Sequence, residues 1–361
     1  MNQIFFELDF LPVGNGERSG DAISLRHGVK DETHIISQEV IVIDGGTKES
    51  GESLVEHIKT FYNTSSVSHV INTHPDIDHA SGLSIVLENL SVGRLWLHQP
   101  WNYAEYLKDK FKDVRWTTEG LAKKLKDSYP FAYSLEEIAK IKKIPISQPF
   151  QGSRIGPFTV LSPTELWYLE LVPEFDNTPE ARQKKRETKF RSFIASIKQW
   201  IDENWDIETL SEDGVTSATN ESSAVLYTNI DNVKILLTAD AGIDALNLST
   251  DYTNSLGIAL NNCNIYQMPH HGSRNNVNPT TLNRILGPKI GIQSARTKYA
   301  MVSSSKVSET HPRKIVCNAF LRRGVSVFST NGLNLSKSHN IDVRPNWHSA
   351  TALPFYDQVE K

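Results

Sequence analysis

The sequence is poor in several features that define whole classes of protein. It has only two cysteines in 361 residues, Cys263 and Cys317, which argues against a disulfide framework and predicts two buried free thiols. It has no run of 18 or more apolar residues, so we expect no membrane span. Its first residues lack the basic segment and apolar stretch of a secretory signal, and we expect a cytoplasmic protein.

The sequence also lacks an excess of positive charge. Its 38 lysines and arginines are outnumbered by 42 aspartates and glutamates, which gives a formal net charge of −4. This balance argues against a surface built as a whole for duplex DNA, but it leaves room for a local basic groove. With 39% apolar and 22% charged residues, the composition is that of an ordinary soluble globular protein.

The hydrophobic pattern alternates between strand and helix, which predicts a layered α/β core. We expect strands at 5–12, 21–26, 40–43, 67–71, 94–97, 224–228, 233–237, 265–268, 290–292 and 326–328, and helices at 52–62, 81–90, 135–143 and 179–205. The polar segment 208–222 is expected to be a mobile loop.

The densest group of potential metal ligands follows the strand at 67–71. His74, Asp76, Asp78 and His79 lie within six residues of one another. A tight turn after a rigid strand end can aim such side chains at one point, and divalent metals bind imidazole nitrogens and carboxylate oxygens. The spacing therefore predicts a metal site, and a solvated loop with incidental histidines is the weaker interpretation.

Two further strand ends carry potential ligands. Asp240 follows an apolar strand, where a carboxylate can bridge two cations, although such an aspartate is often only a loop cap. The pair His270 and His271 follows the strand at 265–268; taken alone, a histidine pair is more often structural. Because three such clusters occur in one chain, we expect them to meet at one metal centre.

The order of these motifs resembles the metallo-β-lactamase superfamily, and within it the hydrolase domain of ComEC-like DNA-uptake proteins. The likeness spans residues 3 to about 337. The matching motifs are Val13-Gly14-Asn15-Gly16, Asp21-Ala22-Ile23, Ile43-Asp44-Gly45-Gly46, Thr238-Ala239-Asp240, His270-His271-Gly272-Ser273, His311-Pro312 and Ser329-Thr330-Asn331-Gly332. The resemblance implies a four-layer αββα sandwich with a helical insertion. One hydrolase domain would cover 1–340, with the insertion at about 165–222 and a C-terminal tail at 341–361.

The chain also departs from the superfamily pattern. The usual His-x-His-x-Asp-His cluster has Asp76 in place of its second histidine, and His98 is the only histidine available as the further ligand that a middle segment usually supplies. Either His98 is recruited or the first metal site is weakened. We expect one firm site and one labile site. The firm site would use Asp78, His79, Asp240 and one of His270 or His271, and the labile site would use His74, Asp76 and Asp240.

A carboxylate in place of an imidazole shifts the preference toward Mn²⁺ or Mg²⁺ relative to Zn²⁺. We therefore expect one or two divalent ions, Zn²⁺ or Mn²⁺, with Mg²⁺ as a further candidate. The resemblance implies phosphodiester hydrolysis, with DNA as the substrate. Asp76 or Asp78 can orient the attacking water, and His271 and His311 are candidates for contacting the phosphate or protonating the leaving group.

Several of these roles have structural alternatives. His311, Ser273 and Thr330 can each contact a phosphate or serve only as turn residues. The lysine-rich segments 123–126 and 140–143 and the basic segment 182–191 can follow a nucleic-acid backbone, or they can be solvated helix faces.

Two other functions remain open. A small ester, amide or cyclic nucleotide could be the substrate, which would require a closed pocket, whereas a nuclease needs an open, positively lined trench. The chain could instead be a regulatory or scaffolding protein with a degenerate site in a multi-component bacterial system. The sequence leaves the oligomeric state and any activating partner undetermined.

Overall fold

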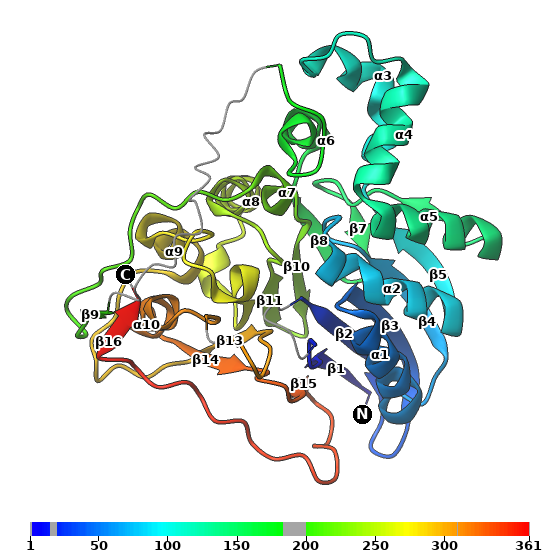
Figure 1. The fold of residues 1–361 in the computed structure, drawn as a ribbon. Helices are drawn as coiled ribbons and strands as arrows, with labels where there is room; N and C mark the ends of the chain where they lie inside the picture. Colours follow the sequence, from blue (N-terminus) through cyan, green and yellow to red (C-terminus); the bar gives the residue numbers. More distant parts are fainter. Residues whose placement is uncertain (1, 15–19, 183–199, 309, 361) are drawn as a thin grey trace.

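The computed structural model describes residues 2–14, 20–182, 200–308 and 310–360. Within these ranges two seven-stranded sheets pack together, and helices cover the outer face of each (Figure 1). This is the four-layer αββα arrangement, so the predicted fold class is confirmed.

The first sheet is built from the N-terminal part of the chain and one late strand. It is antiparallel from β15 to β3 and parallel from β3 to β6. Its strands, in spatial order, are β15 (Leu335–His339), β1 (Gln3–Phe10), β2 (Ala22–Lys30), β3 (Ile35–Gly45), β4 (Ser66–Ile71), β5 (Ser91–Trp96) and β6 (Ile146–Ser147).

The second sheet repeats this plan with the later part of the chain. It is parallel from β14 to β11 and antiparallel from β11 to β7. Its strands, in spatial order, are β14 (Val325–Ser329), β13 (Lys298–Val302), β12 (Ile265–Gln267), β11 (Val233–Leu237), β10 (Val225–Ile230), β8 (Phe158–Ser162) and β7 (Arg154–Ile155).

The helices connect the parallel strands and pack on the outer faces. Those near the first sheet are α1 (Lys48–Phe61), α2 (Ile77–Asn89), α3 (Ala104–Leu107), α4 (Thr118–Ser128) and α5 (Pro130–Lys142). The others are α6 (Glu165–Leu171), α7 (Ala218–Glu221), α8 (Ile243–Ser255), α9 (Pro279–Leu286) and α10 (Lys314–Arg322). Five short 3₁₀ helices join them: η1 (Pro100–Tyr103), η2 (Lys108–Lys110), η3 (Val172–Glu174), η4 (Leu260–Asn262) and η5 (Pro269–Gly272).

Three apolar layers hold the described fold together. The middle layer lies between the sheets, where Phe6 and Phe10 from β1 pack with Phe158 and Leu226 from the second sheet. One outer layer joins the first sheet to α1, α2, α4 and α5, and the other joins the second sheet to α8, α9 and α10. Because burying apolar area is the main favourable term in folding, these layers fix how the strand ends of the two sheets face each other.

The C-terminal residues return to the body of the protein. The strand β16 (Gln358–Glu360) pairs with β9 (Trp200–Asp202), and a Glu360 carboxylate oxygen accepts the backbone N–H of Lys314 at 3.0 Å. Earlier in this segment, Arg344 forms ion pairs with Glu7 and Asp9 on β1. Residues 341–360 are therefore attached at both ends to the sandwich.

Two expectations of secondary structure were wrong, and a third was wrong in part. Of the segment 179–205, where a helix was expected, residues 200–202 form the strand β9, and 183–199 lie outside the described residues. Residues 290–292 form a loop with an exposed Ile292, and the strand is β13, eight residues later. The polar segment 208–222 contains α7 and is partly buried, because its polar groups find partners: the Glu221 carboxylate accepts two N–H groups at the start of α8.

Two expected features agree with the structure. Cys263 and Cys317 are buried free thiols. Among the helices that the structure describes, none has the length and hydropathy needed to cross a membrane.

Candidate metal centre

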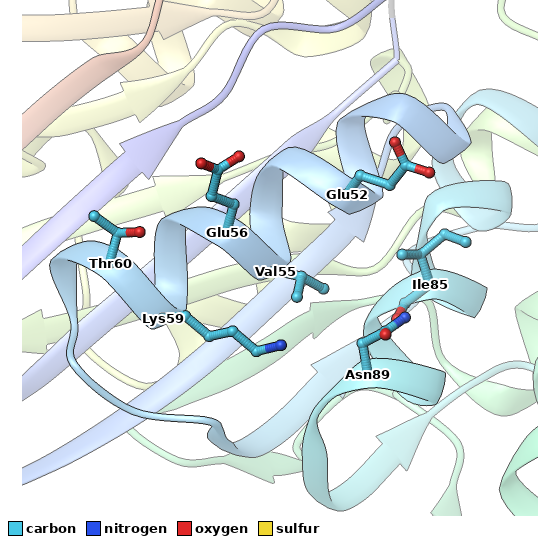
Figure 2. A pocket seen from close by; sticks show the side chains of 7 residues that line it. All are labelled: Glu52, Val55, Glu56, Lys59, Thr60, Ile85 and Asn89. Carbon is cyan, nitrogen blue, oxygen red and sulfur yellow. The ribbon is translucent and has the colours of Figure 1, made fainter.

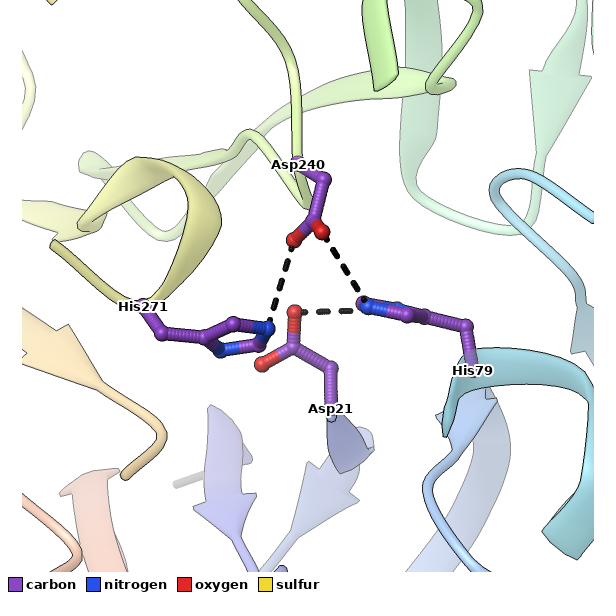
Figure 3. A group of neighbouring side chains, drawn as sticks. All are labelled: Asp21, His79, Asp240 and His271. Carbon is purple, nitrogen blue, oxygen red and sulfur yellow. Dashed lines mark ion pairs between the residues drawn. The ribbon is translucent and has the colours of Figure 1, made fainter. Parts of the chain in front are cut away.

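The potential ligands gather where strand ends of the two sheets face each other. Asp21 stands directly before β2, His79 lies in the first turns of α2, Asp240 follows β11, and His271 lies in the turn after β12. Figure 3 shows these four side chains, from four separate segments, pointing toward a common centre. Their ligand atoms all lie within 4.8 Å of one another, and all four residues are buried.

Asp240 is surrounded by imidazoles. Its Oδ2 is 3.5 Å from Nε2 of His79, 3.5 Å from Nε2 of His270 and 3.7 Å from Nε2 of His74. Its Oδ1 is 3.5 Å from Nε2 of His271. With metal–ligand distances of 2.0–2.2 Å, ligands at the corners of a tetrahedron are about 3.4 Å apart. Each of these separations from Asp240 is therefore close to the distance between two ligands of one cation.

Hydrogen bonds on the far side of two rings fix which nitrogen faces Asp240. The carboxylate of Asp44 accepts from Nδ1 of His79 at 2.8 Å. The hydroxyl of Thr73 donates to Asp44 at 2.6 Å, so it is left to accept from Nδ1 of His74 at 3.0 Å. A ring that carries its proton on Nδ1 presents an Nε2 lone pair, and this is the tautomer that a metal ligand needs.

The backbone of the histidine pair is unusual. His270 and His271 have φ values of 44° and 55°, in the left-handed region that residues other than glycine rarely adopt. Such residues cost of order 1–3 kcal/mol each and are concentrated at functional sites. Here the conformation turns two successive rings toward Asp240.

The electrostatics of the site also favour a bound cation. Burial alone raises the pKa of Asp240, but His270, His79 and His271 hold it well below its ordinary value. Burial lowers the pKa of His79, but the carboxylates of Asp240 and Asp44 raise it well above the usual range. A proton on His79 therefore compensates the buried carboxylates, and a divalent cation can replace it.

Several buried atoms of the site have unmet bonding capacity. Within the described part of the chain, no hydrogen-bond partner is found for Asp21 Oδ1, His74 Nε2, His79 Nε2, Asp240 Oδ1 or either ring nitrogen of His271. Buried polar atoms are almost always paired, so a group of unpaired ones needs an explanation. Imidazole and carboxylate atoms converging at these distances fit one or two divalent cations.

The structure gathers most of the predicted ligands, but Asp78 does not join the four-residue group. Asp76 Oδ2 is 3.7 Å from Nε2 of His74, and both Asp76 and Asp78 line the adjacent cavity. In the group that contains His79, Asp240 and His271, the fourth member is Asp21. Its Oδ2 accepts from Gln267 at 2.7 Å and lies 3.9 Å from Nδ1 of His79, while its buried Oδ1 has no hydrogen-bond partner among the described residues.

Sequence reasoning did not assign Asp21 or Asp44 to the site. Both were landmarks of the resemblance: Asp21 stands directly before β2, and Asp44 is the next-to-last residue of β3. The place of an aspartate at the border of a strand was the only signal of a role in the site, but aspartates are common at such places in loops that bind no ligand. Asp44 also accepts the backbone N–H of Thr73 at 2.8 Å. It is therefore better described as the partner that orients His79 than as a ligand.

Three candidate accessory residues lie apart from the cluster. His98 is buried, stacks on Tyr168 with ring centroids 4.5 Å apart, and belongs to neither ligand group found among the described residues. Burial lowers its pKa to about 3. The hydroxyls of Ser273 and Thr330 bond to backbone groups of Asn275 and Ser304, which are turn roles.

A cavity of about 540 Å³ opens beside the cluster. It is lined by residues 75–78, by the α4–α5 corner at 128–131, by Asp176 and Asn177, and by Asp240, His270, His271 and His311. A second hollow of about 480 Å³ lies between α1 and α2, where Glu52, Glu56 and Lys59 extend around Val55 (Figure 2). None of the potential ligands lines that second hollow, so the first cavity is the candidate substrate site.

The fold and the cluster together define a class: αββα proteins whose strand ends present imidazoles and carboxylates to divalent cations. A family model described as the metallo-beta-lactamase superfamily matches residues 35–288. The chain therefore belongs to the metallo-β-lactamase superfamily.

The solved structures that match the chain include the following three. The metallo-β-lactamase SMB-1 bound to 2-mercaptoethanesulfonate is 10% identical with a TM-score of 0.31, covering 77% of this chain and 86% of its own. A diphosphatase of the PhnP family is 8% identical with a TM-score of 0.38, and the match covers 94% of this chain and 99% of the diphosphatase. Unliganded yeast PDE1 is 12% identical with a TM-score of 0.39, and the match covers 91% of this chain and 98% of PDE1. At these scores the likenesses carry no functional argument. No curated protein matches the chain.

The role of Asp44 gives a first prediction. In Asp44→Asn one of the two accepting oxygens becomes an NH2 donor. The side chain can then no longer accept both from the Thr73 backbone N–H and from the Thr73 hydroxyl and His79, and the Nδ1 proton of His79 loses its charged acceptor. We expect cation affinity to fall about 10- to 100-fold, the usual effect of removing such a partner. Competition with a chromophoric chelator measures this affinity. Asp31→Asn, in an exposed turn, is the control, and equal affinities in both variants would contradict the role given to Asp44.

Proposed function

We propose that this chain is a metal-dependent hydrolase of phosphodiester bonds, with DNA as its substrate. The observation that carries the proposal is the ring of imidazole Nε2 atoms around Asp240 at 3.5–3.7 Å. Divalent cations held there would supply Lewis acidity and a water activated near neutral pH. The order of motifs that resembles ComEC-like hydrolase domains supports the choice of DNA.

The residues of the chain have separate tasks in this proposal. Asp240 and the imidazoles hold the cations, and Asp76 and Asp78 line the cavity where they can accept hydrogen bonds from the attacking water. His311 also lines the cavity, and its ring is parallel to that of His270 with centroids 6.4 Å apart. It can therefore contact a phosphate oxygen bound in the cavity.

His311 and His271 are poor proton donors at neutral pH. Burial, aided by the imidazoles of His271 and His270, lowers the pKa of His311 to about 3, and burial lowers the pKa of His271. Both rings are therefore neutral near pH 7, and the expectation that they protonate the leaving group loses support. His311 remains a neutral hydrogen-bonding group.

A pH profile tests this assignment. We expect His311→Gln to lower kcat/KM by about 10-fold through a lost substrate contact, without moving either limb of the profile between pH 6 and 8. The reason is that the pKa of His311 lies below that window, so its protonation does not change there. Loss of the basic limb in His311→Gln would show that this ring is the proton donor after all.

The lysine-rich segments support a polyanionic substrate only indirectly. They lie on α4 and α5, whose shared corner at 128–131 forms one wall of the cavity. Lys123 pairs with Asp127, and Lys140 pairs with Glu136 and Glu137. A nucleic-acid strand whose phosphate lies at the cluster can pass over these helices. Most of the basic segment 182–191 lies outside the described residues.

The substrate is identified by incubating the purified chain with linear and circular DNA, single- and double-stranded, and with RNA. Each is tested with Mn²⁺, Mg²⁺ or Zn²⁺ and after removal of metal by a chelator. We expect metal-dependent cleavage of DNA and none in the chelated protein. If the chain cleaved bis(p-nitrophenyl) phosphate but no nucleic acid, it would be a phosphodiesterase, and the proposal that it is a nuclease would be wrong.

One observation favours a second function, hydrolysis of a small ester, amide or cyclic nucleotide. Among the described residues that line the cavity there is no lysine or arginine, while Asp76, Asp78, Asp176 and Asp240 are all present. A site without positive side chains relies on its cations to attract a phosphate. A cavity of about 540 Å³ also lies within the size range of small-molecule sites. Turnover of a cyclic nucleotide with DNA left intact would select this alternative.

A further inference from the structure

We propose that His270 and His271 bind two different cations, one on each side of Asp240, and that Asn276 positions His270 for this role. The inference rests on the proposed function in one respect, that the cluster binds divalent cations. It goes further by dividing the histidine pair between two ions and by naming the residue that sets the protonation of one ring.

The two histidines face different oxygens of one carboxylate. Nε2 of His271 lies 3.5 Å from Oδ1 of Asp240, within the buried group that also contains Asp21 and His79. Nε2 of His270 lies 3.5 Å from Oδ2, the oxygen that also faces His74 at 3.7 Å. A carboxylate with a separate imidazole at each oxygen has the arrangement of a bridge between two cations.

The second position becomes complete only with His270. Without it, the ligands available there are His74, Asp76 and one oxygen of Asp240, because His98 is packed elsewhere. With His270 the number of candidate ligands reaches four, the usual number for a tetrahedral site. These four are not among the groups of described residues whose ligand atoms all lie within 4.8 Å of one another, so a cation at this position would have to draw them closer together. His79, which also faces Oδ2 at 3.5 Å, stands between the two positions.

The two positions also differ in exposure. The side chain of His271 is 6% exposed, whereas that of His270 is 33% exposed and borders the cavity. The His271 side would therefore hold a cation enclosed by protein. The His270 side would hold one next to the cavity, where it could exchange and contact a bound substrate.

Asn276 decides which nitrogen of His270 is protonated. Its Nδ2 donates to the backbone carbonyl of Asp240 at 2.8 Å, and this contact fixes the orientation of the amide. Its Oδ1 therefore faces Nδ1 of His270, at 2.8 Å, and can only accept. The proton of the neutral ring is thus on Nδ1, and the Nε2 lone pair points toward Asp240.

A second amide competes for the same nitrogen. Nδ2 of Asn220 is 3.0 Å from Nδ1 of His270, and if it donated there the ring proton would move to Nε2. Asn276 has the shorter contact and the orientation that a second hydrogen bond fixes. Asn276 is also buried, with 1% of its surface exposed. The geometry therefore assigns the control of this tautomer to Asn276.

Cation stoichiometry tests the division of the pair. The metal-free full-length chain is dialysed against increasing Mn²⁺, and bound metal is measured by elemental analysis. We expect two sites in the parent.

In His270→Ala we expect one site with the affinity measured in the parent and a second site whose affinity is weakened at least 10-fold. In Asn276→Leu we expect the second site to weaken about 10- to 100-fold, as for other partners of metal-binding histidines. Asn275→Leu changes the exposed neighbouring asparagine and is the matched control, expected to match the parent.

The tautomer is measured independently in the parent. Two-bond ¹H–¹⁵N spectra of the Zn²⁺-loaded chain, with His270 assigned from His270→Ala, should show a protonated Nδ1 and an unprotonated Nε2. The opposite tautomer would overturn the role of Asn276, and this measurement stands even if Asn276→Leu does not fold.

The possible failures can be told apart. A parent that binds no cation defeats the proposed function and this inference together. A parent with one site, or two parental sites in His270→Ala, overturns only the division of the histidine pair. Loss of both cations in Asn276→Leu, with one lost in His270→Ala, would mean that Asn276 holds Asp240 and not His270.

Discussion

Asp240→Asn is expected to abolish cation binding and catalysis while leaving the protein folded. Asp240 supplies both oxygens around which the imidazoles gather, and a neutral amide cannot bridge two cations. We expect kcat/KM to fall by at least about 100-fold, the effect of removing one strong electrostatic contact from an active site. The parent should gain about 2.7 kcal/mol of stability at a Mn²⁺ concentration 100 times its Kd, and the variant should gain none.

Thermal unfolding with and without Mn²⁺ measures the binding, and far-UV circular dichroism checks the fold. Asp127→Asn is the control, because Asp127 forms an exposed pair with Lys123 away from the cavity. A folded Asp240→Asn variant that turns over substrate as fast as the parent would rule out both enzymatic functions. The degenerate-site alternative, a regulatory or scaffolding protein, would then be the remaining one.

Arg344→Met is expected to cause the largest loss of stability. The Arg344 guanidinium donates to both oxygens of Asp9, at 3.0 and 2.7 Å, and is 2.9 Å from Glu7. Both carboxylates lie on β1 and are at most 2% exposed. Without Arg344, Asp9 keeps only His57 and Glu7 keeps only Arg26 as an ion-pair partner in the described part of the chain, so part of the buried negative charge loses its compensation. We therefore expect a loss of about 3 kcal/mol in the free energy of unfolding. Urea unfolding at pH 7 measures it.

The pH dependence of this loss has a definite sign. Burial raises the pKa of Asp9, but His57 and Arg344 together hold it below its ordinary value. A carboxyl with a lowered pKa in the folded state stabilises the protein above its unfolded value of 3.8, and this contribution disappears as the pH falls. The difference between parent and Arg344→Met should therefore shrink below pH 4. Arg115→Met, at an exposed pair with Asp113, should unfold like the parent. If Arg344→Met did the same at pH 7, the attachment of the C-terminal segment would not depend on this ion pair.

Local sequence patterns were enough to place most elements of the sandwich. The apolar run before His74 is β4, and the helical spacing at 81–90 lies within α2. Such elements are predictable because period and turn residues are local properties of the chain. The expectations failed where burial depends on distant partners, as at Glu221, whose polar neighbourhood is buried because its carboxylate caps α8.

What the sequence determined by itself is which strand ends carry imidazoles and carboxylates, and this was enough to predict a site able to hold a divalent metal. Only the tertiary structure decided which of those side chains meet. It brought Asp21 into the cluster, left Asp78 at the cavity wall, and set His270 and His271 against different oxygens of Asp240. The reason is physical: a ligand set is defined by distances of a few ångströms between segments far apart in the chain. Those distances follow from how the two sheets pack.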